Sequence, residues 1–190
     1  IFASNPNVLN LIHFNSRSEK ISNDLIKIFN KYENIDGFQL NIVWPEYKEV
    51  NHFKENCMES FQVVPRIVIQ VSGSAYSQVN RNPAQLVEKL KRYNGSMTDI
   101  LFDLSGGKGK KIDIDQTRTV LEHLYLEFGD YINICIAGGL GPCTLESIKP
   151  LFVDYPNLSI DTESNVRTYD VLDHYKCEEY CDEYLEYFQK

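Results

Sequence analysis

The stretch DILFDLSGGKGKKID, residues Asp99–Asp113, decides the fold class that this sequence predicts. Its first part, Asp99–Leu104, is mostly apolar, which is typical of a strand buried in a parallel sheet. A loop rich in glycine and lysine follows this strand directly. In α/β proteins the carboxyl ends of parallel strands carry the chemistry. Asp103, at the end of the predicted strand, is therefore the first candidate site residue.

The same pattern of a short β-rich run followed by a helical stretch recurs along the chain. Successive runs begin roughly 30 residues apart, which is the length of one βα unit. Such alternation predicts a parallel sheet covered by helices. The six runs are Val8–Phe14, Gly37–Val43, Arg66–Val71, Asp99–Leu104, Tyr131–Ala137 and Leu158–Asp161.

The stretches between the runs have apolar residues at helical spacing. Asn82 and Pro83 supply a cap and a first-turn proline to one of them. The last helix is expected over about Tyr169–Phe188, a segment rich in tyrosine. No linker or low-complexity tract divides the chain, so we expect residues 1–190 to form a single α/β domain.

Two architectures fit six βα units. The first is an open, doubly wound sheet, which accepts six strands as they stand. The second is a TIM-type (βα)8 barrel, which needs two further units and typically about 250 residues. With 190 residues the barrel would be an incomplete version with six visible units. The spacing of the runs favours the open sheet, whereas the motifs favour the barrel.

The loop after Asp103 consists of Gly106, Gly107, Lys108, Gly109 and Lys110. Glycine lets a backbone approach a ligand closely, and the lysines bring positive charge into an acidic chain. The loop is not a Walker A motif, because the spacing and the Ser or Thr after Lys are missing. It is interpreted either as a loop whose backbone approaches a ligand closely or as a mobile, solvated loop that the strand-end Asp103 caps.

Two further strand ends carry small or polar residues that suit an anion. Gly138 and Gly139 follow the fifth run, and Ser164 and Asn165 follow the sixth. Backbone N–H groups in such turns bind phosphate, and barrels often build a phosphate site from the loops after their last two strands. The alternative for the glycine pair is a plain tight turn.

Charge and composition exclude several functional classes. Hydrophobic residues make up 43% of the chain and charged residues 24%, as in ordinary globular proteins. The formal net charge of −8 disfavours nucleic acid as a partner, since that role needs a positive surface. No apolar run reaches about 18 residues, so we expect no membrane partner.

The five cysteines are widely spaced and odd in number, so they predict no disulfide framework. We therefore expect a cytoplasmic protein, because a reducing compartment keeps thiols free. Cys177 and Cys181 are one helical turn apart, but no histidine or second cysteine pair completes a zinc set. The sequence accordingly predicts no metal site.

These motifs together resemble the C-terminal half of phosphoribosylanthranilate isomerase, a ribulose-phosphate-binding (βα)8 barrel. The family shows a strand ending in Asp, a Gly-Gly-x-Gly-Lys-x-x-Asp loop, a Gly-Gly-Leu strand end and a final Asp before a phosphate loop. The resemblance is specific over about the last 70 residues of the range 8–168. The residues in register are Gly106, Gly107, Gly109, Lys110, Asp113, Gly138, Gly139, Leu140, Asp161, Ser164 and Val166.

The resemblance implies an Amadori rearrangement in tryptophan biosynthesis, in which a phosphorylated aminoaldose becomes an aminoketose without metal or organic cofactor. Asp103 matches the family's general acid. Gly138, Gly139, Ser164 and Asn165 match its phosphate loops. Residues 106–110 match the loop that closes over the phosphorylated small-molecule substrate.

The chain also departs from the family. The Lys-x-Cys-Gly segment that carries the family's base is missing, as is the arginine expected after the second strand. The six strands would correspond to strands three to eight, so we expect about 50–60 further residues before Ile1. A partner subunit, as in a homodimer, or closure of a smaller barrel would also cover the unpaired strand edges.

Three functional interpretations follow. The leading one is a phosphoribosylanthranilate isomerase-like enzyme that acts on a small phosphorylated sugar derivative. The second is a sugar-phosphate-binding relative without catalysis. The third is an open α/β interaction domain whose aromatic C-terminal helix docks a partner.

Overall fold

The computed structural model describes residues 5–104 and 111–188. Within them a six-stranded, wholly parallel sheet has the order β1-β2-β3-β4-β5-β6. Each strand lies inside, or within one residue of, one of the six predicted runs, so the prediction of alternating βα units is confirmed. The strands are β1 (Leu11–Phe14), β2 (Gly37–Leu40), β3 (Arg66–Ser72), β4 (Asp99–Asp103), β5 (Asn133–Ala137) and β6 (Ser159–Asp161).

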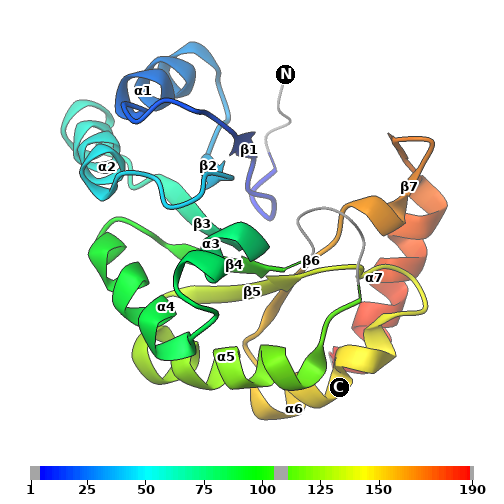
Figure 1. The fold of residues 1–190 in the computed structure, drawn as a ribbon. Coiled ribbons are helices and arrows are strands. Elements are labelled where there is room, and N and C mark those ends of the chain that lie inside the picture. The colour runs from blue at the N-terminus through cyan, green and yellow to red at the C-terminus, as the bar shows by residue number, and fades with distance from the viewer. Residues whose placement is uncertain (1–4, 105–110, 189–190) are drawn as a thin grey trace.

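Helices alternate with the strands and surround the outer side of the sheet (Figure 1). The α-helices are α1 (Ser22–Lys31), α2 (Tyr47–Phe61), α3 (Gly73–Gln78), α4 (Pro83–Leu90), α5 (Ile114–Phe128), α6 (Lys149–Asp154) and α7 (His174–Phe188). The 3-10 turns of the described residues are η1 (Lys91–Tyr93), η2 (Leu145–Ile148) and η3 (Ser164–Val166). A small antiparallel hairpin of β7 (Arg167–Thr168) and β8 (Val171–Leu172) precedes α7. No helix of the described residues is long and apolar enough to cross a membrane.

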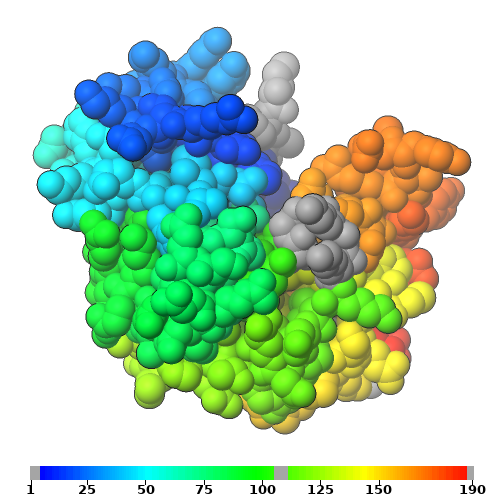
Figure 2. All heavy atoms as spheres, viewed as in Figure 1, coloured from blue at the N-terminus to red at the C-terminus, as the bar shows by residue number. Residues whose placement is uncertain are grey.

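The observed strand order differs from that of an open, doubly wound sheet, so that alternative is wrong. A doubly wound sheet reverses its strand order at a switch point and has helices on both faces. Here the order is strictly sequential, so the crossovers all return on one face, as in a barrel wall. The sheet curls into a half-barrel whose edges are β1 and β6, and the described residues do not close it. Figure 2 shows the N-terminal part and the region around β7 on opposite sides of the open gap.

The two faces of the sheet differ in chemistry because side chains alternate along each strand. The outward residues, such as Phe38, Ile69 and Ile100, are fully buried in the core beneath the helices. The inward positions carry polar groups on nearly every strand, whereas a complete barrel usually fills its interior with branched apolar residues. The concave face is therefore suited to polar chemistry. Its polar residues include His13, Gln39, Gln70, Asp99, Asp103, Asn133, Ser159 and Asp161.

Two helix predictions have different outcomes. Asn82 does cap α4, since its side chain accepts a hydrogen bond of 3.0 Å from the Gln85 amide. The predicted helix over Tyr169–Phe188 was wrong at its start. Tyr169 and Asp170 have φ angles of 50° and 61° in the turn between β7 and β8, so the helix cannot include them. Asp173 then caps α7 by accepting hydrogen bonds from the amides of the first turn.

Helix α1 owes its N-terminal cap to a residue from α2. Its N-cap residue makes no side-chain cap bond, and Glu49 accepts hydrogen bonds from the Ser22 amide at 3.0 Å and the Ser22 hydroxyl at 2.6 Å. The hydroxyl bond and then the amide bond lower the pKa of Glu49. The negative carboxylate of Glu49 also interacts favourably with the positive, N-terminal end of the α1 dipole.

We expect Glu49→Gln to lower the free energy of unfolding by about 1 kcal/mol at neutral pH. A lowered pKa contributes stability above the unfolded-state pKa, and this is lost as pH falls through the folded-state value. The difference in stability between variant and parent should therefore shrink as the pH falls through the lowered pKa of Glu49. Urea unfolding over a series of pH values from neutral to acidic measures it. Glu55→Gln, an exposed position on the same helix, should change stability by less than about 0.5 kcal/mol; an equal loss in both variants would contradict the capping role.

Candidate functional site

A hollow at the carboxyl edge of the sheet brings together all five residues predicted to catalyse or to bind phosphate. Asp103 comes from the end of β4, Gly138 and Gly139 follow β5, and Ser164 and Asn165 lie in η3 after β6. The hollow has a volume of about 30 Å³ and is open to solvent. Three strand ends that are distant in the sequence therefore converge on one place. The predicted closing loop, residues 106–110, lies outside the described part of the chain.

The turn after β5 has a backbone that requires glycine. Gly138 has a φ of 134° and Gly139 a φ of 60°, conformations that side-chain-bearing residues rarely adopt. Gly141 is also confined, because a Cβ atom there would lie 2.4 Å from the Cβ of Asn165. The backbone of the loop after β5 therefore lies directly against the Asn165 side chain of the loop after β6.

Two side-chain hydrogen bonds fasten these loops to each other. The Asn165 side-chain amide donates to the Gly139 carbonyl at 2.8 Å, and the Thr162 hydroxyl donates to the Leu140 carbonyl at 2.7 Å. The Gly138 and Gly139 amides donate no hydrogen bond to any described residue outside the strand ladder. Asn165 therefore binds the turn through the Gly139 carbonyl oxygen. The amides of Gly138 and Gly139 remain as donors for an anion.

Acidic side chains also line the hollow. Asp103 is buried, with 5% of its surface exposed, and Asp161 and Glu163 lie beside it. Burial, followed by the negative charges of Asp103 and Glu163, raises the pKa of Asp161, which the positive charge of His13 partly opposes. Arg167 lies 3.4 Å from Glu163 and offsets part of its charge.

A chain of hydrogen bonds across the concave face orients Asp103. The Gln39 side-chain amide donates to Gln70 at 3.2 Å, and the Gln70 amide donates to the Asp103 carboxylate at 3.2 Å. Gln70 is buried, with 8% of its surface exposed. The sequence did not single out Gln70, although its position on the same face as Asp103 follows from the period-two alternation of a strand.

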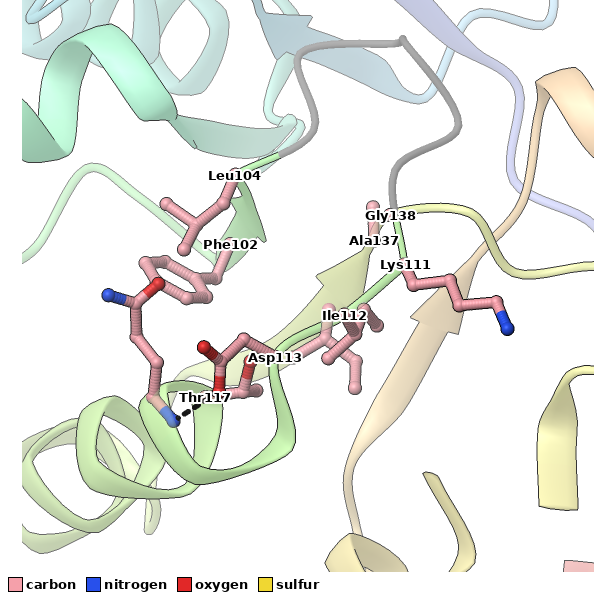
Figure 3. A pocket seen from close by; sticks show the side chains of 10 residues that line it. Phe102, Leu104, Lys111, Ile112, Asp113, Thr117, Ala137 and Gly138 are labelled. Atoms are coloured by element: carbon pink, nitrogen blue, oxygen red, sulfur yellow. Dashed lines mark hydrogen bonds between the residues drawn. The ribbon is translucent and has the colours of Figure 1, made fainter. Parts of the chain in front are cut away.

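A second hollow, of about 130 Å³, lies between the ends of β4 and β5 and the start of α5 (Figure 3). Its walls are largely apolar, with Phe102 and Ile112 among them. Asp113 borders it and caps α5, accepting a hydrogen bond of 3.0 Å from the Gln116 amide. Gly138 lines both hollows, so this apolar space adjoins the candidate phosphate site.

The chain matches no protein-family model, and no curated protein matches it. The resemblance to phosphoribosylanthranilate isomerase therefore rests on the motifs quoted above.

Proposed function

We propose that the carboxyl edge of this half-barrel binds a small phosphorylated sugar derivative. The phosphate would lie against the amides of Gly138 and Gly139 and the η3 turn that contains Ser164 and Asn165. The observation that carries the proposal is the single hollow in which these residues and Asp103 meet. Backbone N–H groups at such turns bind phosphate without requiring a cationic side chain.

The acidic neighbours set a condition on this binding. The hollow contains the carboxyl groups of Asp103, Asp161 and Glu163, and each one repels a phosphate when it is ionised. The raised pKa of Asp161 favours its neutral form, and Arg167 screens Glu163. Phosphate binding and proton binding at Asp161 should therefore favour each other.

The pair of carboxyl groups also supports proton transfer on the bound sugar. An Amadori rearrangement needs an acid to protonate the ring oxygen and a base to remove the proton from C2. Burial, and after it the charge of Asp103, raises the pKa of Asp161, which favours the protonated form of Asp161. We therefore assign the acid role to Asp161 and the base role to Asp103, the reverse of the role that the resemblance implies for Asp103. The reaction proposed is isomerisation of a phosphorylated aminoaldose.

The second candidate function is sugar-phosphate binding without catalysis. It needs only the turns that line the hollow, because backbone amides there can hold an anion without any group that transfers a proton. Both candidates predict phosphate binding at the same loops, and only the first predicts turnover.

We expect ribose 5-phosphate to bind this chain, and Gly139→Val to weaken its binding at least about tenfold. Valine at a φ of 60° is strained, so the turn would move and its amides would point elsewhere. Isothermal titration calorimetry measures the effect. Lys108→Ala should weaken binding less, because backbone donors dominate.

The matched control is Gly95→Val, which introduces the same kind of strain at a φ of 87° in open space, outside the candidate site. Gly95→Val should bind like the parent. Equal affinities for Gly139→Val and the parent would show that the phosphate site is misplaced.

A further inference from the structure

The hydroxyl group of Tyr180 is buried and unpaired. Tyr180 lies on α7, with 9% of its surface exposed, and belongs to the hydrophobic core. Its hydroxyl oxygen is shielded from solvent and has no hydrogen-bond partner among the described residues. A buried hydroxyl without a partner costs free energy, and native structures rarely contain one. The hydroxyl is therefore available to a group that changes its state when the site works.

Tyr180 lies beside the strand that ends in Asp161. Its side chain lines a hollow between α7 and β6 together with Ser159 and Ile160, and Asp161 is the next residue of that strand. Helix α7 also contacts η3, the turn that follows Asp161 in the candidate phosphate site. The hydroxyl is therefore held by the core next to the proposed acid.

The groups around the hydroxyl keep it protonated. Burial, followed by the negative charges of Asp161 and Cys135, raises the pKa of Tyr180. Cys181 and Tyr184, on the same helix, act in the same direction. Among all these neighbours Asp161 has the largest effect. At neutral pH the hydroxyl therefore keeps its proton and can donate it in a hydrogen bond.

The ionised form of Asp161 lacks a hydrogen-bond donor. Asp103 and Glu163 oppose its negative charge, and His13 of β1 favours it. No hydrogen bond from a described residue contributes to lowering the pKa of Asp161. A carboxylate that forms here would gain from a donor, because hydrogen bonds to charged acceptors are stronger than those between neutral groups.

We propose that Tyr180 is a positioning residue for Asp161, whose carboxylate accepts a hydrogen bond from the Tyr180 hydroxyl after Asp161 protonates the bound sugar. The inference rests on the proposed function of Asp161 as the acid. In that step the Asp161 proton moves to the ring oxygen, the bond from this oxygen to C1 breaks, and the amine nitrogen forms a double bond to C1. No proton leaves Tyr180. Its hydrogen bond strengthens as the carboxylate forms, so it favours the transition state over the bound substrate.

Carboxyl NMR titration of Asp161 in Tyr180→Phe tests this contact without substrate. Phenylalanine removes only the hydroxyl, so the ionised carboxylate loses its donor. The acid dissociation constant of Asp161 should fall about tenfold, the opposite direction to that expected for Asp103→Asn. With a phosphorylated aminoaldose, kcat should fall about tenfold or more while KM changes little. The Tm should not fall, because the hydroxyl that is removed has no partner.

The matched control is Tyr125→Phe, which removes another buried hydroxyl without a partner among the described residues. Burial, then Tyr155 and Cys135, raises the pKa of Tyr125, and Asp161 is not among the causes. This variant should leave the Asp161 titration and kcat unchanged. An unchanged Asp161 titration or an unchanged kcat in Tyr180→Phe, or equal changes in Tyr125→Phe, would overturn the proposal. A parent without turnover would contradict the proposed reaction, and the Asp161 titration would still decide whether Tyr180 contacts Asp161.

Discussion

Asp103→Asn is expected to lower the turnover of a phosphorylated aminoaldose by about 10²-fold or more. Asparagine keeps the shape of the side chain and can still accept the Gln70 hydrogen bond, but it cannot take up a proton at neutral pH. The loss should appear in kcat, and phosphate affinity should not fall, because a negative charge beside the phosphate has been removed. Steady-state kinetics together with a sugar-phosphate titration separates the two effects.

The same substitution should change the titration of Asp161. The negative charge of Asp103 is one cause of the raised pKa of Asp161, so that pKa should move down in the variant. Carboxyl NMR titration measures it. Asp130→Asn, an exposed position after α5, serves as the control and should leave both turnover and the Asp161 titration unchanged. Turnover of Asp103→Asn equal to that of the parent would remove Asp103 from the mechanism.

Gly37→Ala is expected to destabilise the fold by at least about 3 kcal/mol. Gly37 begins β2 and pairs with Leu11 of β1 and Arg66 of β3. A Cβ atom at this position would lie 1.9 Å from the Arg66 carbonyl oxygen, far inside van der Waals contact. Strand β3 cannot retreat freely, because the Arg66 amide donates to the Asp36 carbonyl at 2.8 Å and its guanidinium is paired with Asp99.

In urea unfolding, the urea concentration at the midpoint should be much lower for Gly37→Ala than for the parent. The control is Gly95→Ala, where a Cβ meets nothing within 4 Å but the φ is 87°. That variant should lose only the conformational cost of about 1–2 kcal/mol. A loss at Gly37 no larger than that at Gly95 would mean that the strands separate easily, contrary to a tightly paired half-barrel wall.

The parts of the fold that could be predicted are those determined by local pattern. In β3 and β4 the side chains that face the helices are buried, and the apolar composition of these two runs was enough to predict strands there. The glycine pair after β5 signalled a turn by itself, because few other residues adopt such φ angles. The start of α7 could not be predicted from local pattern. Helical periodicity continues upstream of Asp173, although the chain forms the β7–β8 hairpin there and the helix begins only after the Asp173 cap.

The parts of the site that could not be predicted depend on tertiary packing. Gln70 looks like any polar strand residue until the curl of the sheet places it against Asp103. Tyr180 becomes a neighbour of Asp161 only when α7 packs against β6. A single sequence has no local signal for either pairing.

Phosphate binding at the turns after β5 and β6 can be followed by the backbone amide chemical shifts during titration with inorganic phosphate. We expect the amides of Gly138, Gly139, Ser164 and Asn165 to shift together and to saturate with one dissociation constant. Shifts confined to the larger hollow of about 830 Å³ that includes Arg17 and Trp44, between the ends of β1 and β2, would contradict it.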